Sequence, residues 1–276
     1  MLSRTITFRP STPADLDGIL PLVRRDAACP LTAERYLSYL DDGQYSHGRT
    51  WIAADGAGDI RAVAVWWAGP EGAEPRALDA VYVHESVGVG EERVALAAEL
   101  LGAGQRAFAE AFGQTQPPEF HVFIPSDWRD RPEVMGALTW RRAAAERAGL
   151  WTLLERLRFE WTPQDGLVDP IRGLEFRPEP DDEVFVDLFA RVLSGSLDTT
   201  STRQAAQLGA VEQARQDLVH LRDLMLGERS WWRVAVNADG DVVGRADTDL
   251  VNKPMAEAFL RVGYRNHARR LVFSAS

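Results

Sequence analysis

The sequence predicts an α+β fold made of two related domains, and a repeat and a linker are the observations behind this prediction. Phe-Arg-Pro occurs at Phe8 and again at Phe176, each time followed by an acidic turn and then apolar residues at helical spacing. Thr162–Pro170, "TPQDGLVDP", combines prolines, a glycine and aspartates, which is typical of a linker. We therefore expect one domain at 1–163, a linker at 164–171 and a second domain at 172–276.

After its first strand and helix, each copy continues with a strand hairpin. "TWIAADGAGDIRAVAVWW" and "SWWRVAVNADGDVVG" both place Asp-Gly or Gly-Asp between two β-prone runs, which is the pattern of a tight hairpin turn. Each copy closes with a helix that ends at a glycine, Gly149 or Gly263, and then a strand. Between hairpin and closing helix, the first copy adds a strand at Ala77–His84, a helix at Glu91–Phe112 and a strand at Glu119–Ile124. We expect each domain to form a mixed, mostly antiparallel sheet flanked by helices.

The second copy is shorter than the first at one place, after its hairpin. Gly58 and Gly149 are 91 positions apart, Gly240 and Gly263 are 23 apart, and the difference is 68. A true deletion of a whole strand–loop–helix unit would leave a long unpaired sheet edge, which proteins avoid. We therefore expect that about 68 residues are missing from the printed sequence near 243–245, and that the backbone shows a break near Val243–Arg245.

Composition excludes several classes of function. The formal net charge of −10 and pI of about 5.1 argue against nucleic acid or an anionic membrane as the main partner. Cys29 is the single cysteine, so no disulfide framework is expected within the chain. The five histidines have no partners at metal-ligand spacing, so we expect no metal site. The beginning of the sequence has no apolar run of signal-peptide length, and we expect a cytoplasmic protein whose oligomeric state is open.

The order of the elements and the stretch "ADTDLVNKPMAEAFLRVGY" resemble the GNAT superfamily of acyl-CoA-dependent N-acetyltransferases, in a tandem two-domain form. The stretch is similar to the family's fifth strand and following helix, with an Asn just past the strand and Gly-aromatic closing the helix. The resemblance covers nearly the whole chain. It implies transfer of an acetyl group from acetyl-CoA, as co-substrate, to a primary amine of a small molecule or peptide. The alternative is a catalytically inactive acyl-CoA-binding or structural protein of the same fold.

The resemblance also implies where the coenzyme binds. In the family the pantetheine arm lies where the fourth strand splays from the fifth, and a glycine-rich loop after the fourth strand holds the pyrophosphate on backbone N–H groups. The first copy has Gly88 and Gly90 at this loop, but Glu91 and Glu92 stand where phosphates would dock, and they would repel them. We therefore expect the N-terminal copy to be degenerate and to bind no pyrophosphate.

The remaining candidates for coenzyme binding are in the second copy: Thr248, Asn252, Met255 and Phe259. The Asn252 carboxamide is able to bond a pantetheine amide, or else it caps the next helix. Met255 and Phe259 belong to an apolar stripe that also fits simple core packing. Phe259 occupies the position where the family often carries the tyrosine that protonates the leaving thiolate.

No catalytic residue is identified by the sequence. Glu85, at the end of the first copy's central strand, is a candidate base only if the N-terminal domain is the active one. The pairs Trp66-Trp67 and Trp231-Trp232 fit either an acceptor pocket or core packing, and we favour packing because neighbours in a strand face opposite sides.

Overall fold

The computed structural model describes residues 5–69, 74–160, 162–165, 175–196, 199–224, 229, 232–236, 253–261 and 263–275. The chain divides into two compact units, one of Met1–Arg158 with His267–Ser276 and one of Phe159–Asn266. The end of the chain, which we expected in the second domain, thus belongs to the first unit. The boundaries proposed for the two domains otherwise stay a prediction.

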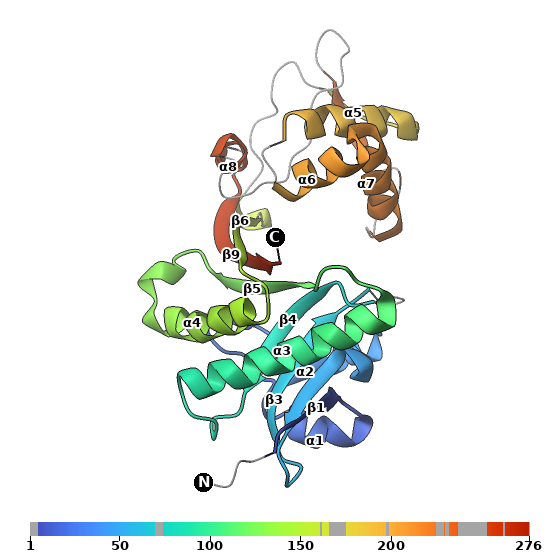
Figure 1. The fold of residues 1–276 in the computed structure, drawn as a ribbon. Helices are drawn as coiled ribbons and strands as arrows, with labels where there is room; N and C mark the ends of the chain where they lie inside the picture. The colour runs from blue at the N-terminus through green and yellow to red at the C-terminus, as the bar shows by residue number, and fades with distance from the viewer. Residues whose placement is uncertain are drawn as a thin grey trace. The chain divides into compact units, whose positions relative to one another are not determined.

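A seven-stranded sheet in the order β1-β2-β3-β4-β5-β9-β6 forms the centre of the first unit (Figure 1). Its strands are β1 (Thr7–Pro10), β2 (Thr50–Ala54), β3 (Ile60–Trp67), β4 (Ala77–Val83), β5 (Glu119–Pro125), β6 (Thr152–Glu160) and β9 (Arg265–Ser274). β1 to β4 pair antiparallel in sequence, β4 pairs parallel with β5, and β5 pairs antiparallel with β9. The predicted α+β class, with a mixed and mostly antiparallel sheet, is confirmed.

Helices cover both faces of this sheet. The buried residues of α3 (Glu91–Phe112) and α4 (Pro132–Arg147) belong to a core on one face, and those of α1 (Leu16–Ile19) and α2 (Ala33–Asp41) belong to a core on the other. Figure 1 shows α3 and α4 lying side by side over the strands. The strand, helix and strand predicted between hairpin and closing helix are confirmed, each within one residue of the expected ends. Short 3-10 turns complete the described elements, at η1 (Pro13–Asp15), η2 (His47–Arg49), η3 (Trp128–Asp130) and η4 (Pro163–Asp165).

The side chains of β3 alternate between the two cores, as a strand buried on both faces requires. Trp66 is fully buried against α3, where its ring meets Phe108 at 5.1 Å between centroids, while Trp67 packs against the core of the opposite face. Gly104 of α3 permits this packing, because a Cβ there would lie 2.7 Å from the Trp66 ring. The preference for core packing at Trp66 is therefore confirmed.

β9 lies between β5 and β6, so the end of the chain completes the sheet of the first unit. Leu271 and Phe273 of β9 are fully buried in the core that α3 and α4 cover. The ring of Phe273 lies 5.9 Å from that of Phe120, its register partner on β5. The sheet therefore joins residues that are far apart in the sequence, and its core depends on the C-terminal strand.

Glu155 on β6 holds the turn that follows β5. Its carboxylate accepts hydrogen bonds from both terminal nitrogens of Arg129 at 3.1 and 2.6 Å and from the Trp128 indole at 3.4 Å. Arg269 of β9 lies 3.2 Å from the same carboxylate. Burial opposes ionisation of Glu155, but the hydrogen bonds from Arg129 and Trp128 outweigh it and lower the pKa of this carboxyl.

Replacing Glu155 by glutamine is expected to lower the free energy of unfolding at pH 7 by about 1.5–3 kcal/mol, the contribution of hydrogen bonds to a charged group. Because the folded-state pKa is lowered, this stabilisation is full above the unfolded-state pKa of about 4.3 and is lost as the pH falls through the folded-state value. Urea unfolding of wild type and Glu155→Gln at pH 7 and pH 3 measures the difference, which should shrink at pH 3. Glu99→Gln, at an exposed carboxylate of α3, is the control and should show little difference at either pH. A Glu155→Gln difference that grows on acidification would contradict the assignment.

The described part of the second unit pairs a two-stranded antiparallel sheet with helices. β7 (Glu175–Pro178) and β8 (Arg233–Val236) form the sheet, and the helices are α5 (Asp182–Ser194), α6 (Thr199–Leu208), α7 (Ala210–Leu224) and α8 (Lys253–Arg261). α5, α7 and β8 share a core in which Phe185 meets Trp232 at 5.5 Å. The predicted backbone break near Val243–Arg245 lies outside the described residues.

Candidate functional site

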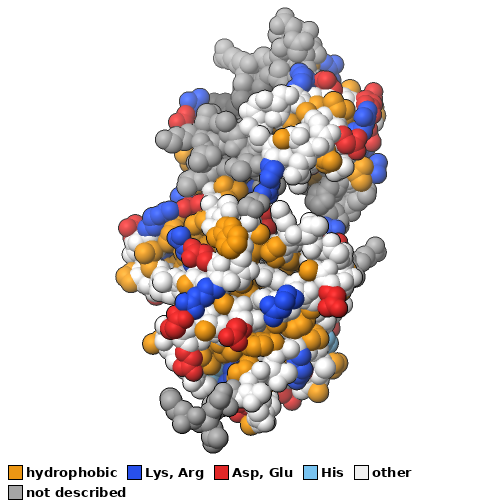
Figure 2. Space-filling view, viewed as in Figure 1, with side chains coloured by type: hydrophobic (Ala, Val, Ile, Leu, Met, Phe, Trp, Pro, Cys, Tyr) orange, Lys and Arg blue, Asp and Glu red, His pale blue; other side chains and the backbone are white. Residues whose placement is uncertain are grey.

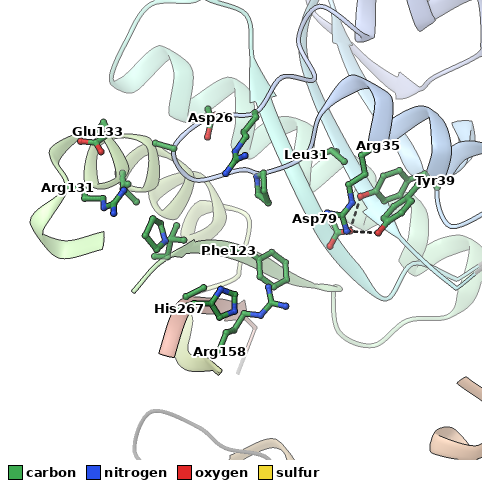
Figure 3. A pocket seen from close by; sticks show the side chains of 18 residues that line it. Asp26, Leu31, Arg35, Tyr39, Asp79, Phe123, Arg131, Glu133, Arg158 and His267 are labelled. Atoms are coloured by element: carbon green, nitrogen blue, oxygen red, sulfur yellow. Dashed lines mark hydrogen bonds between the residues drawn. The ribbon is translucent and has the colours of Figure 1, made fainter. Parts of the chain in front are cut away.

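A cavity of about 650 Å³ opens in the first unit where β4 and β5 diverge (Figure 3). Its walls come from the loop 25–31, from α2, from the ends of β5, β6 and β9, and from the start of α4. In Figure 3, Arg35, Tyr39 and Asp79 gather on one side of the cavity, and Phe123, Arg158 and His267 gather on another. The size is that of a site for a small molecule.

Two irregularities of β4 create this cavity. β4 and β5 pair only at Ala77–Glu119 and Leu78–Phe120, and no further register is shared along the rest of the two described strands. On its other side, β4 slips against β3 between Val65–Ala80 and Trp66–Leu78, which leaves Asp79 as the extra residue of a β-bulge. Bulges re-aim a side chain, and here the bulged residue is the aspartate that lines the cavity.

Asp79 is a carboxylate in an apolar strand, "ALDAVYV". The hydroxyl of the buried Tyr45 donates a hydrogen bond of 3.0 Å to it. Arg35 instead donates to the Tyr39 hydroxyl at 2.6 Å. Burial raises the pKa of Asp79, and the nearby His121 and Arg35 act in the opposite direction. The cavity therefore holds a carboxylate that is partly removed from water.

Arg141 of α4 occupies the space beside β4 where the strand has left β5. Its side chain is fully buried, and Nε and Nη2 donate to the Val81 carbonyl at 3.3 and 3.2 Å. Nη2 also bonds the carboxylate of Asp26, which lines the cavity, and Nη1 donates to Ala137. A buried backbone carbonyl needs a hydrogen-bond donor, and the guanidinium supplies one to Val81. One arginine thus links α4, β4 and the loop 25–31.

Acidic side chains cover the loop between β4 and α3, which begins at Glu91. The Glu91 carboxylate pairs with Arg147 of α4. The carboxylate of Glu92 folds over Gly88, so that a Cβ added to this glycine would meet its Oε2 at 2.7 Å. Negative charge stabilises the N-terminal end of a helix, and here the protein's own carboxylates provide it. Glu85 is 79% exposed, lies 3.5 Å from Arg24, and is not among the residues that line the cavity.

Of the predicted coenzyme residues, only Phe259 has a described side chain. Its ring stacks on Phe159 at 5.0 Å and meets Tyr264 at 5.3 Å between centroids. Met255 lies in α8, while Thr248 and Asn252 lie outside the described residues. Gly263 has a φ of +85° and Tyr264 donates its amide to Phe259, which confirms the predicted glycine end of this helix. The coenzyme-binding set of four residues therefore stays a prediction.

Sequence reasoning missed the residues that shape the first unit's cavity. Asp79 carried a signal, because a carboxylate flanked by Leu78 and Ala80 is unusual inside a buried strand. Arg141 carried no such signal. The next residue, Arg142, is also an arginine and forms an exposed pair with Glu146, so the residue type does not show which of the two side chains is buried.

The described residues show no other specialised site. None of their helices has the length and apolarity needed to cross a membrane, and we find no group of three or more His, Cys, Asp or Glu able to hold a metal among them. On the face shown in Figure 2, acidic and basic side chains are interspersed over α3 and α4.

Comparison with known proteins gives no family model and no curated protein that matches the chain. Among solved structures, the chain resembles a GCN5-related N-acetyltransferase from Sphaerobacter thermophilus, at 16% identity over 97% of this chain and 94% of that one, with a TM-score of 0.45. It resembles a tandem GNAT protein from the clavulanic acid biosynthesis pathway, at 13% identity over 99% of both chains, with a TM-score of 0.41. A glucosamine N-acetyltransferase region of a fungal β-N-acetylglucosaminidase matches at 12% identity over 99% of this chain and 38% of that one, with a TM-score of 0.49.

Proposed function

We propose that this protein is a tandem GNAT-type N-acetyltransferase, which transfers the acetyl group of acetyl-CoA to the primary amine of a small molecule or peptide. The observation that carries the proposal is the divergence of β4 from β5. The two strands run parallel, pair at their first residues and then separate, as the fourth and fifth strands of the resembling family do. The order of strands and helices along the first unit also follows that family.

We place acetyl-CoA in the second unit, against Thr248, Asn252, Met255 and Phe259. Two features of the first unit support this placement. The guanidinium of Arg141 already bonds Val81 in the gap beside β4, and the Glu92 carboxylate covers Gly88 of the loop that would hold phosphates. The first unit then serves as a non-catalytic partner of the second.

In the reaction, the neutral amine attacks the thioester carbon and forms the new C–N bond. The C–S bond breaks, the thiolate leaves, and the nitrogen gives its surplus proton to solvent. A backbone N–H beside the oxyanion would stabilise it. Phe259 has no proton to give the thiolate, so the thiolate takes one from solvent. Loss of a general acid slows the reaction by about 10²–10⁴-fold. Positioning the amine against the thioester lowers the activation barrier by about 7–11 kcal/mol, which is the larger effect. The reaction therefore tolerates the loss of the acid.

The second candidate is a catalytically inactive acyl-CoA-binding or structural protein of the same fold, which the bond from Arg141 to Val81 beside the gap and the phenylalanine at 259 both favour. Free-thiol release from acetyl-CoA, measured with a panel of amines, separates the two candidates. Amine-dependent release is expected for the enzyme. Stabilisation by acetyl-CoA without thiol release would favour the binding protein, and neither effect would favour the structural protein.

Replacing Asn252 by leucine is expected to weaken acetyl-CoA binding by about 1–3 kcal/mol, because a buried amide of the pantetheine arm would lose its partner. Calorimetric titration of the full chain measures the affinity, and thermal unfolding without ligand measures the stability. Unchanged affinity with a lowered melting temperature would show that Asn252 is a helix cap instead.

A further inference from the structure

Asp79 is a half-buried carboxylate at the β-bulge of β4, and its surroundings favour the protonated form. The hydroxyl of Tyr45 donates the one hydrogen bond that it accepts from the described chain, at 3.0 Å (Figure 3). Burial, and after it the charge of Asp79, raise the pKa of Tyr45, so this hydroxyl keeps its proton and stays a donor. Among the described residues, no cation lies within ion-pair distance of the Asp79 carboxylate. A carboxylate with so little compensation for lost water binds a proton more readily than one in solvent.

The other ionisable groups nearest to Asp79 come from α2 and β5. On α2, Arg35 donates to the Tyr39 hydroxyl at 2.6 Å. On β5, His121 follows the residue that pairs with Leu78 of β4, and its Nε2 lies 3.2 Å from a carboxylate oxygen of Glu119. Burial raises the pKa of Asp79 by more than the Tyr45 hydrogen bond, His121 and Arg35 together lower it. The remaining ionisable residues of the cavity wall lie on other elements: Arg25, Asp26, Arg131, Glu133, Arg158 and His267.

Tyr45 joins Asp79 to the segment between α2 and β2. Its ring is buried and packs on that of Tyr39 of α2, at 5.2 Å between centroids. Its amide donates to the Tyr39 carbonyl at 2.8 Å, and the carbonyl of the preceding Gln44 accepts from the amide of Ala68, just after β3, at 3.1 Å. The contact between Asp79 and Tyr45 is therefore part of a hydrogen-bonded junction of β4, α2 and the end of β3, which we call the Tyr45 junction.

We propose that Asp79 is a pH-sensitive catch in the first unit: a proton on its carboxyl group tightens the Tyr45 junction, and loss of this proton loosens it. The neutral carboxyl group still accepts the hydrogen bond from Tyr45, whereas the carboxylate gains hydration when the junction opens. Because the folded-state pKa of Asp79 is raised, the stabilisation is fully present below the unfolded-state value of about 3.9 and is lost as the pH rises through the folded-state value. The catch does not depend on acetyl transfer.

Hydrogen exchange of the full chain without ligand tests the catch at the amides of Tyr45 and Ala68. Their protection factors, corrected for the intrinsic exchange rate at each pH, should rise by about fivefold or more from pH 7.5 to pH 4.5 in wild type, since one unit of pKa shift is a tenfold change in proton affinity. Asp79→Asn imitates the neutral carboxyl group and should show the higher protection at both pH values. The matched control is Asp41→Asn, which removes the same charge from an exposed position at the end of α2 and should follow wild type.

A carbon-13 titration of the side-chain carboxyl groups gives a second readout that needs no change at Asp79. In wild type, Asp79 should titrate with a pKa above the ordinary value for aspartate of about 3.9, and His121→Gln should raise this pKa further because a positive neighbour is removed. The proposal is overturned if Asp79 titrates at or below the ordinary value, or if wild type and Asp79→Asn show the same pH dependence of protection. Lower protection in Asp79→Asn than in wild type at pH 7.5 would also overturn it, because the carboxylate itself would then hold the junction.

Discussion

Replacing Phe273 by alanine is expected to lower the free energy of unfolding of the first unit by about 3–5 kcal/mol, the usual cost of removing a buried phenylalanine ring. Phe273 is 1% exposed and packs against Phe120 in the core under α3 and α4. Because β9 also pairs with β5 from Phe120 to Pro125, loosening β9 should expose β5 as well. Hydrogen exchange at the amides of Phe120 and Val122 in urea reports on the first unit alone.

Phe112→Ala is the matched control for this experiment. Phe112 ends α3 and is 41% exposed, so its loss should change stability by no more than about 1 kcal/mol. If Phe273→Ala behaved like Phe112→Ala, the C-terminal strand would not be part of the first unit's core, and the described sheet order would be wrong at β9.

Replacing Arg141 by alanine is expected to cost about 3 kcal/mol, the lower end of the range for breaking a buried ion pair. The substitution removes the donors to Val81 and Ala137 and leaves the Asp26 carboxylate without its partner. The lower end applies because the Asp26 side chain is 36% exposed and gains hydration when the arginine is gone. Urea unfolding with the same amide probes on the first unit measures the change.

The neighbouring residue supplies the control. Arg142 is exposed and forms an i,i+4 pair with Glu146, so Arg142→Ala should cost about 0.3–0.5 kcal/mol. Equal effects at the two positions would mean that Arg141 does not hold α4, β4 and the loop 25–31 together, and the reason for placing coenzyme in the second unit would weaken.

The sequence predicted the elements of the first unit well because their signals are local. The β-prone run of β3 and the glycine after α4, Gly149 with a φ of +89°, each depend on neighbours within a few positions. The place of β9 was not predictable in this way. Its pattern indicates a strand, but the choice of β5 as partner depends on a sheet edge assembled from residues more than a hundred positions earlier.

The cavity was missed for a related reason. Asp79 enters it through a bulge between β3 and β4, and Arg141 reaches Val81 from a helix sixty positions away. Neither contact leaves a periodic pattern in the sequence. The expectation that the loop at Gly88 and Gly90 binds no pyrophosphate depends only on Glu91 and Glu92, which follow it directly, and it stays a prediction.

A crystal structure of the full chain with acetyl-CoA tests the central claim most directly. We expect the pantetheine arm beside Asn252 in the second unit, with Arg141 still bonded to Val81 and Asp26 in the first. Phosphates bound against Gly88 and Gly90, with Glu92 displaced, would contradict this account and move the active site to the first unit.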